Sequence, residues 1–546
     1  MGERREFGVR VRANAGQGEE QEEVFAFLSR PESYAGADGA AADVRRIDTH
    51  GAVVFLAGGD VYKVKRAVCY SFMDFSTREK RRAACDSEIA VNRANAPGVY
   101  LGVTPIVRMP EGLALGADIA PGGEVPDGAD VVEWAVHMRR FDENATLDRL
   151  AERGALPDDV TARLAGMVAR AHASAPVAAD PAASVDALGR YIDRNAEGLA
   201  TRPGLFSVEE VKAVRAASRA ALDAQRPLLL SRAGAGFVRR CHGDMHLRNI
   251  ALIDGAPVLF DAIEFDESIA TVDILYDLAF LLMDLWDRGL EGVANGVLNR
   301  YLWARGEEAD VAGLAALPLF LSIRAGVRAM VTAAALPHLE GDARAKAERE
   351  ARGYLALAGA FIAPAPVRLA AIGGLSGTGK STLAAMLAPR IGRPVGAVHL
   401  RSDIERKNLF GVAATEHLPS SAYTRDVTLR TYARLRRLAA LALDAGQSVI
   451  ADAVHAAPEE REAIRRVAED AGARFDGLWL EAPQAVLEAR VEARTGDASD
   501  AGADVVRAQS AYDTGAIDWR RLRTGGTPDE VAAAAAPLLG IGEGAA

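Results

Sequence analysis

Residues 369–381, LAAIGGLSGTGKS, contain the most specific pattern in the chain. Gly374–Ser381 matches G-x-x-x-x-G-K-[ST] in full, follows an apolar stretch that predicts a strand, and opens a predicted helix. Glycines let successive backbone N–H groups turn toward a phosphate, and the helix N-terminus adds positive partial charge. The alternative, a glycine-rich turn that binds nothing, fits match and context together far less well. The segment is therefore predicted to hold a nucleotide phosphate.

The residues expected to contact this phosphate come from the loop and the first helical turn. They are Gly374, Ser376, Gly377, Thr378, Gly379, Lys380, Ser381 and Thr382. Lys380 is expected to reach the β- and γ-phosphates, and the hydroxyl of Ser381 to bind Mg²⁺.

Two carboxylates follow later strands of the same region. Asp403 ends the second predicted strand, where it could accept the proton of an acceptor hydroxyl or cap the next helix. Asp452 ends the apolar strand SVIAD, where it could hold Mg²⁺ through water or play a capping role. Arg490 and Arg494 lie one helical turn apart before a Gly/Asp/Ser-rich stretch. This pair suits a lid that closes on phosphates, although a solvated helix face is the alternative.

Strands and helices alternate from Val367 to the end of the chain, which predicts a parallel sheet with crossover helices, an α/β domain. This part resembles the P-loop kinases of the gluconate-kinase, zeta-toxin and polynucleotide-kinase group over about 367–539. The resemblance implies transfer of the ATP γ-phosphate to a hydroxyl, with Asp403 as base and the two arginines in a lid. It leaves the acceptor open.

A second motif, His242-Gly-Asp244-Met-His-Leu-Arg-Asn249, precedes Leu-Phe-Asp261. Its spacing places a carboxylate, Asp244, where it can orient and deprotonate a hydroxyl, and an amide, Asn249, where it can hold Mg²⁺. A predicted hairpin turning at Asp254-Gly255 would return Asp261 to the side of Asn249, as a second metal ligand.

The upstream part is consistent with a nucleotide site. Lys63 and Lys65 lie on one face of a predicted strand, and position favours Lys65 as the phosphate contact. Glu88, in a helix predicted over 77–95, is the expected ion-pair partner, with Glu79 as the runner-up. Backbone groups of residues 134–138 are expected to contact adenine.

These residues resemble the aminoglycoside and choline phosphotransferases, and the whole chain after residue 20 resembles a bacterial group that fuses such a domain to an ATP-binding kinase domain. The resemblance implies an α+β protein-kinase-like N-terminal domain. The sequence DAIEFDE departs from the commoner pattern after the metal-binding Asp, and Glu264 and Asp266 could add contacts or displace the usual geometry.

We therefore expect a disordered segment over 1–20, a phosphotransferase-like domain over 21–363 (small lobe about 21–140, large lobe about 141–363) and a P-loop kinase domain over 364–546, with the boundary at the prolines Pro364 and Pro366. The three cysteines match no zinc pattern and fit a reducing compartment. Without a signal-like N-terminus or a spanning run of apolar residues, we expect a cytoplasmic protein and no membrane partner.

The motifs together predict an ATP- and Mg²⁺-dependent phosphotransferase, bifunctional, acting on the alcohol group of a sugar, an aminoglycoside or a nucleoside-like molecule. The net charge of −11 argues against a long nucleic acid. Two alternatives stay open: a nucleotide-binding regulatory protein with one active domain, and a polynucleotide or toxin-type kinase in the C-terminal domain. The oligomeric state and the preference for ATP over GTP are not indicated by the sequence.

Overall fold

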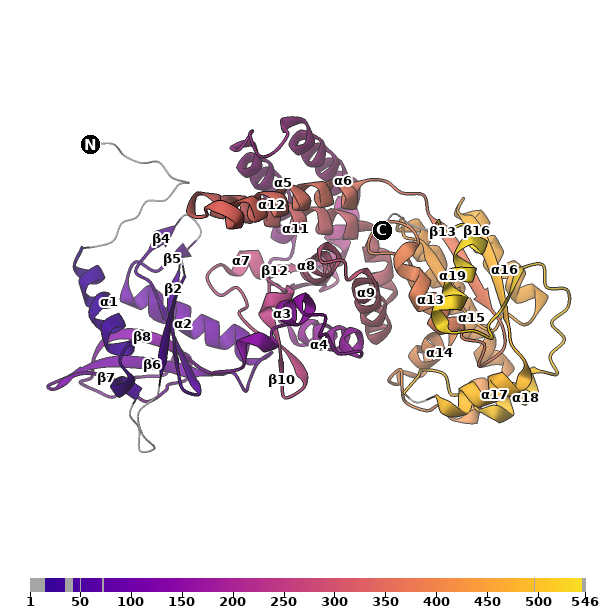
Figure 1. Cartoon of the computed structure of the whole chain (residues 1–546), viewed down its shortest axis with the longest axis horizontal. Helices are drawn as coiled ribbons and strands as arrows, with labels where there is room; N and C mark the ends of the chain where they lie inside the picture. Colours follow the sequence, from indigo (N-terminus) through magenta and orange to yellow (C-terminus); the bar gives the residue numbers. More distant parts are fainter. Residues whose placement is uncertain (1–14, 35–42, 50, 71–72, 495, 543–546) are drawn as a thin grey trace. The chain divides into compact units, whose positions relative to one another are not determined.

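The structure is a computed structural model that describes residues 15–34, 43–49, 51–70, 73–494 and 496–542 (Figure 1). The chain forms two compact units. Unit 1 comprises Met1–Pro157, Ala171–Ala178 and Arg239–Val272, and unit 2 comprises Asp158–Arg170, Ala179–Val238 and Asp273–Ala546. The domain limits given above are drawn from sequence and stay a prediction.

A six-stranded antiparallel sheet forms the first part of unit 1, in the order β1-β2-β3-β8-β6-β7. The strands are β1 (Val44–Asp48), β2 (Ala52–Ala57), β3 (Asp60–Lys65), β6 (Tyr100–Met109), β7 (Gly112–Leu115) and β8 (Asp130–Arg139). A small hairpin of β4 (Cys69–Tyr70) and β5 (Met73–Asp74) follows β3. Strand β3 confirms the predicted strand that carries Lys63 and Lys65.

Helix α2 (Arg78–Arg93) packs on one face of this sheet, where Cys85 and Ile89 meet Val103 and Val136. Thr77 caps the helix by accepting a hydrogen bond from the backbone of Lys80, as an N-cap threonine does. The helix thereby presents Glu88 toward β3.

Helix α1 (Ala15–Leu28) packs on the other sheet face through Val24, Phe25 and Leu28. Residues 15–20, expected to be disordered, thus lie in a helix, because the apolar residues that follow them find a buried partner on the sheet. The remainder of that predicted segment, residues 1–14, falls outside the described residues.

The second part of unit 1 contains the hairpin that the sequence predicts after Asn249. Strands β10 (Ile250–Ile253) and β11 (Ala256–Leu259) pair with Ile250 opposite Leu259. Asp254 and Gly255 turn the hairpin with positive φ angles of 50° and 75°. The backbone N–H of Phe260 donates to the carbonyl oxygen of Asn249 at 3.0 Å. Asp261, the next residue, therefore lies close to the motif of residues 242–249, which we call the catalytic-loop motif.

Helices dominate the chain between the two sheets. In chain order the elements are α3 (Leu147–Glu152), α4 (Val160–Ser174), α5 (Ala182–Ala200), α6 (Val208–Gly234), β9 (Val238–Arg240), α7 (Glu267–Ala270), β12 (Thr271–Asp273), α8 (Ile274–Asp287), α9 (Glu291–Arg305), α10 (Glu308–Gly313), α11 (Leu317–Ala335) and α12 (Gly341–Ile362). Helix α11 packs against α5, α8 and α12 inside unit 2 (Figure 1).

The segment Glu308–His338 is long and apolar enough to cross a membrane, but 72% of its most apolar window is buried within the protein. It also carries the buried Arg324, whose guanidinium lies 4.0 Å from the ring centre of Tyr276. These features are those of a core helix.

The C-terminal part of unit 2 is a five-stranded parallel sheet in the order β14-β15-β13-β16-β17. Its elements in chain order are β13 (Arg368–Gly373), α13 (Lys380–Leu387), β14 (Val398–Arg401), α14 (Ser402–Phe410), α15 (Arg425–Asp444), β15 (Val449–Asp452), α16 (Pro458–Asp470), β16 (Arg474–Glu481), α17 (Gln484–Ala493), α18 (Ala503–Gln509), β17 (Arg520–Arg523) and α19 (Pro528–Leu538). The predicted parallel α/β domain is confirmed, and β17 is an unforeseen edge strand.

Candidate active sites

Two lysines and three carboxylates form a buried charge cluster in unit 1. Lys63 Nζ lies 2.8 Å from Glu88 Oε1 and 2.9 Å from Asp261 Oδ1. Lys65 Nζ lies 2.5 Å from Glu88 Oε2 and contacts Glu264. Glu88, fully buried, therefore bridges both lysines.

The other candidate partner, Glu79, is exposed in the first turn of α2. The side chain of Lys63 is 17% exposed and that of Lys65 is 2% exposed. Lys63 is thus the lysine that borders both solvent and Asp261.

Electrostatics favour the charged forms of Glu88, Lys63 and Lys65. Burial alone would raise the pKa of the Glu88 carboxyl, but the ammonium groups of Lys63 and Lys65 outweigh burial and lower it. Burial alone would lower the pKa of Lys63, but Asp261 and Glu88 raise it well above its ordinary value. The cluster is consequently a fixed array of opposite charges beside the predicted nucleotide site.

The catalytic-loop motif places Asp244 and Asn249 in contact. Asn249 Nδ2 donates to Asp244 Oδ2 and to the Asp244 carbonyl oxygen, both at 3.0 Å. His246 Nε2 lies 3.3 Å from Asp244 Oδ2, and His242 Nε2 lies 2.8 Å from the carbonyl oxygen of Phe260. The two histidines thus support the loop, while the Asp244 side chain keeps 38% of its surface exposed.

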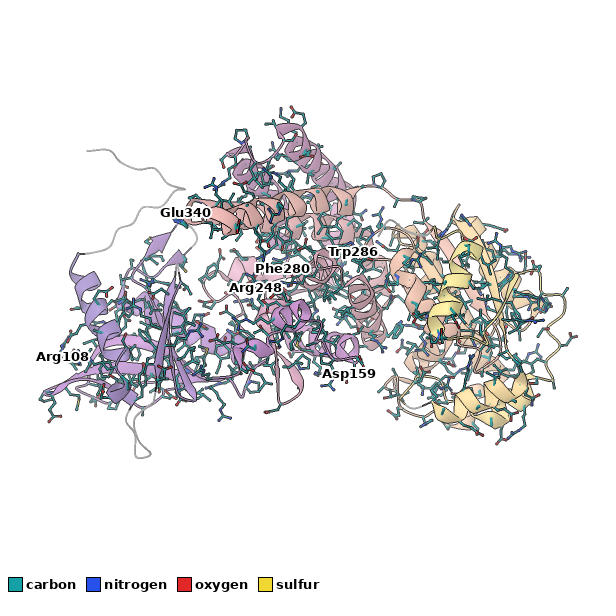
Figure 2. The ribbon with its side chains drawn as sticks, viewed as in Figure 1. Arg108, Asp159, Arg248, Phe280, Trp286 and Glu340 are labelled. Atoms are coloured by element: carbon teal, nitrogen blue, oxygen red, sulfur yellow. The ribbon has the colours of Figure 1, made fainter. Side chains whose placement is uncertain are left out.

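The neighbouring Arg248 is labelled in Figure 2. Its Nε lies 3.5 Å from the Asp148 carboxylate.

Asp261 is held in a specific backbone conformation by the small lobe. Its φ angle is +61°, which is uncommon for a residue other than glycine. The hydroxyl of Tyr100 accepts a hydrogen bond from the Asp261 backbone at 3.0 Å, and Asn92 Oδ1 accepts one from Ala262 at 2.8 Å. Glu264, whose role the sequence left open, joins Lys65. These contacts fix the carboxylate of Asp261 beside Lys63.

The oxygen donors of this site fit Mg²⁺. Because Asn249 turns its Nδ2 toward Asp244, its Oδ1 faces the opposite direction. The Asp261 side chain is 47% exposed. An amide oxygen and a carboxylate are ligands that Mg²⁺ prefers, so Asn249 and Asp261 would hold the ion.

The predicted adenine contact at residues 134–138 is wrong. Those residues lie inside β8, where Ala135 pairs with Val64 of β3 and with Thr104 of β6. Their backbone groups are therefore used by neighbouring strands on both sides. Strand β8 ends at Arg139, so a backbone contact to a base would have to come from the segment after it.

The phosphate loop of unit 2 has a concave backbone. Gly374, Gly377 and Gly379 adopt φ angles of 136°, 85° and 88°, which glycine alone adopts readily. A Cβ at Gly377 would lie 2.6 Å from the carbonyl oxygen of Leu487. Conformation therefore favours glycine at all three positions, and at Gly374 and Gly377 an added Cβ would also clash with a backbone carbonyl oxygen.

The side chains of the loop point inward. Lys380 Nζ donates to the carbonyl oxygen of Leu375 at 3.0 Å, across the loop. Gln509 of α18 accepts a hydrogen bond from the Ser376 backbone at 2.8 Å, a contact that the sequence analysis missed because it joins distant segments.

A cavity of about 750 Å³ lies over this loop. All the predicted residues of this domain except Gly374 line it: Ser376, Gly377, Thr378, Gly379, Lys380, Ser381, Thr382, Asp403, Asp452, Arg490 and Arg494. Its volume is that of a site for a nucleotide-sized ligand.

Asp452 occupies the strand end next to the phosphate loop, opposite Ile372 of β13. His399 Nε2 lies 3.3 Å and Arg401 Nε 3.7 Å from Asp452 Oδ2. Burial by itself would raise the pKa of the Asp452 carboxyl, but His399 and the nearby cations lower it strongly. The group is ionised, and with the Ser381 hydroxyl it supplies oxygen donors that fit Mg²⁺.

Asp403 lies in the first turn of α14, while Arg401 occupies the N-cap position. Asp403 therefore lies inside the helix and not at its N-cap, and the side chain of Arg401 makes no capping hydrogen bond. Burial raises the pKa of the Asp403 carboxyl, partly offset by Arg401. A buried carboxyl with a raised pKa, facing a cavity, suits proton abstraction.

The two predicted lid arginines have different partners. Arg490 Nη2 donates to the carbonyl oxygen of Thr524 at 2.6 Å. Arg494 Nη2 donates to the carbonyl oxygens of Ser499 and Ala501 at 3.0 and 2.9 Å, so it organises the segment that borders the cavity.

Asp500, which the sequence analysis did not single out, joins that segment to the opposite wall. It lies 2.9 Å from Lys407 Nζ and accepts from the Tyr423 hydroxyl at 2.6 Å. In the sequence, only the Gly/Asp/Ser-rich stretch after Arg494 could have pointed to Asp500.

Comparison with known proteins assigns the two regions to families. Residues 60–314 match the family described as "Phosphotransferase enzyme family", and residues 369–513 match a family described as "AAA domain". Among solved structures, a choline/ethanolamine kinase family protein from Mesorhizobium loti is 16% identical, covers 62% of this chain and 99% of its own, and has a TM-score of 0.33. A sugar kinase from Janibacter is 22% identical, covers 32% of this chain and 96% of its own, and has a TM-score of 0.26.

One relative extends over both regions at once. An uncharacterized protein of Mycobacterium tuberculosis is 31% identical over 484 residues, which are 87% of this chain and 91% of the relative. The chain belongs to the family of this mycobacterial protein, in which a phosphotransferase enzyme family domain is fused to an AAA-type P-loop kinase domain.

Proposed function

We propose that this protein is a bifunctional ATP-dependent phosphotransferase, and that each domain transfers the γ-phosphate of ATP to a hydroxyl of a small molecule. One observation carries the proposal: in each site a lysine lies near carboxylates, Lys63 with Glu88 and Asp261 in unit 1 and Lys380 with Asp403 and Asp452 around the P-loop cavity. Phosphoryl transfer requires mainly such positioning and charge neutralisation.

In the unit 1 site, Asp244 accepts the proton of the acceptor hydroxyl. Its exposed carboxylate is oriented by Asn249 and by His246. Lys63, fixed by Glu88, neutralises charge on the phosphates. Magnesium, held by Asn249 and Asp261, would screen the charge that develops during transfer.

In the P-loop site, the backbone of the glycine loop and Lys380 bind the phosphates. Asp403, at the cavity wall, removes the acceptor proton, since burial holds its pKa above the ordinary value. Ser381 and Asp452 supply the magnesium ligands. Arg490 and Arg494, which line the same cavity, neutralise the transferred group.

Charge pairing supports a small acceptor over a nucleic acid at the P-loop domain. Of five arginines that could form a basic groove, Arg434, Arg436, Arg437, Arg465 and Arg466, four have carboxylate partners. Arg434 and Arg437 contact Glu308, Arg465 contacts Asp518, and Arg466 lies 3.1 Å from Glu462. An array of neutralised arginines contributes little to phosphate-backbone binding.

Separate inactivation of the two sites tests the proposal. The Asp244→Ala, Lys380→Ala and double variants are incubated with γ-labelled ATP, Mg²⁺ and a panel of sugars, nucleosides and aminoglycosides. We expect each single variant to lose a different set of labelled products, and the double variant to lose all. If neither substitution lowers label transfer or ATP hydrolysis, the proposed function is wrong.

A further inference from the structure

One face of α9 carries Asn295, Asn299 and Trp303, spaced four residues apart, so that they line up along the helix. The helix lies within the region that matches the phosphotransferase family, yet these three side chains bond with the backbone of the P-loop domain. Helix and P-loop domain are both in unit 2, and α9 lies against α13 and α14 (Figure 1).

The partner of this face is the edge strand β14 and the residue before it. Asn295 Nδ2 donates to the carbonyl oxygen of Ala397 at 3.0 Å, and Asn299 Nδ2 donates to the same oxygen at 3.2 Å. Asn299 Oδ1 accepts from the backbone of His399 at 2.7 Å, and Trp303 Nε1 donates to the His399 carbonyl oxygen at 2.8 Å. The helix thus satisfies the backbone groups that an edge strand leaves unpaired.

These contacts are buried and specific. Asn295 and Asn299 are 2% and 3% exposed. A buried amide requires hydrogen-bond partners, and here those partners are backbone atoms of the other domain. Such a row of matched donors and acceptors fixes the position of β14 along the axis of α9.

The same strand carries the side chains that hold Asp452. His399 and Arg401 both approach Asp452 Oδ2, and both also contact Trp303. The His399 ring meets the indole edge-on at 5.4 Å, and the Arg401 guanidinium lies 5.6 Å from the indole centre. Trp303 therefore touches both groups that orient the proposed magnesium-binding carboxylate.

A second set of contacts connects the end of α9 to the helix that carries Asp403, the proposed base. Arg434 Nη2 donates to the carbonyl oxygen of Gly306 at 2.7 Å, just beyond α9, and its Nε donates to Glu405 at 2.7 Å. Glu405 lies two residues after Asp403 in α14. The end of α9 is thereby tied to the helix that carries the proposed base.

We infer that Asn299 and Trp303 are positioning residues of the P-loop site, so that a helix of the phosphotransferase domain sets the geometry of magnesium binding in the other domain. The inference rests on the proposed function of the P-loop site. Neither residue touches substrate; both act through β14, His399 and Arg401 on Asp452.

The test uses the full chain with Asp261→Ala, which removes a proposed metal ligand of the unit 1 site. Asn299→Ala and Trp303→Phe are compared with Asn195→Ala, a matched control that also loses a buried amide-to-carbonyl bond, to Ile323 at 3.1 Å, inside the helical region. Measurements are the Mg²⁺ concentration for half-maximal ATP hydrolysis, calorimetric ATP binding in EDTA, and the melting midpoint. Trp303→Phe keeps an aromatic side chain but removes the indole N–H that bonds His399, and it provides the folded variant should Asn299→Ala fail to fold.

For Asn299→Ala and Trp303→Phe we expect the Mg²⁺ concentration for half-maximal ATP hydrolysis, the Mg²⁺ requirement, to rise about tenfold, which corresponds to about 1.4 kcal/mol. ATP binding in EDTA should be unchanged. Asn195→Ala should keep the parent's Mg²⁺ requirement even if it melts earlier. Equal Mg²⁺ dependence in all three variants overturns the inference and leaves the proposed function standing. If the Asp261→Ala parent shows no Mg²⁺-dependent ATP binding that Lys380→Ala removes, the proposed function of the P-loop site fails, and the inference fails with it.

Discussion

Replacing each lysine of β3 by methionine separates a binding role from a folding role in unit 1. Lys63 is partly exposed and lies between Glu88 and Asp261, whereas Lys65 is buried between Glu88 and Glu264. We therefore expect Lys63→Met to impair nucleotide binding and Lys65→Met to impair folding, contrary to the order that sequence position favours.

The structure sets the size of each effect. Without Lys65, Glu264 loses its buried partner, and breaking a buried pair costs about 3–5 kcal/mol. At roughly 2–4 °C per kcal/mol, the melting midpoint of this region should fall by about 6–20 °C. Without Lys63, Glu88 keeps Lys65 and Asp261 is half exposed, so the melting midpoint should fall much less. Loss of a charge aimed at the phosphates should lower kcat/KM by roughly 10²–10³.

The assay uses Lys380→Ala as the background, so that only the unit 1 site responds to ATP. Melting is followed with and without Mg·ATP, and ATP binding is measured by calorimetry. We expect Lys63→Met to melt close to the parent and to lose the protection by ATP, and Lys65→Met to melt early. Normal ATP binding by Lys63→Met, together with a normal melting midpoint for Lys65→Met, would refute the assignment.

Three further predictions concern the P-loop site. Lys380→Ala should lower its kcat/KM by roughly 10²–10³ and leave the products that depend on Asp244 unchanged; loss of both product sets would contradict two independent sites. Because burial raises the pKa of Asp403, the acidic limb of the pH–rate profile should lie above the pH range of an ordinary carboxyl, since the base works only when deprotonated. Asp403→Asn should remove that limb and slow transfer by roughly 10²–10⁴; an unchanged profile would exclude Asp403 as the base. In the Asp261→Ala background, Gly377→Ala should abolish ATP protection in thermal melting, because φ is +85° and the added Cβ would meet Leu487. An exposed control in the same background, Gly472→Ala, with φ +61° and open space, should keep it.

Local patterns in the sequence were sufficient for the phosphate loop, the catalytic-loop hairpin and the alternation of the C-terminal domain. Each depends on residues within a few positions of one another, such as Gly374–Ser381 or Asp254-Gly255. Backbone conformation at those positions follows from residue type, since glycine, and to a lesser extent aspartate and asparagine, tolerate positive φ angles. The fold class could therefore be predicted.

Choices between equivalent residues depended on tertiary packing. Lys63 and Lys65 share one strand face, and only the approach of Asp261 and Glu264 from about 200 residues downstream distinguishes them. The pairing of residues 134–138 with strands on both sides was likewise not visible in the sequence, because it joins segments that are distant along the chain.

The sequence by itself determined that this chain contains two kinase-type domains, because short motifs encode local backbone shapes. Only the tertiary structure decided which side chains meet: Glu88 with both lysines, and the α9 side chains with the edge of β14. The physical reason is that hydrogen bonds and ion pairs between distant segments depend on how helices and sheets pack. A single sequence carries no periodic signal for that arrangement.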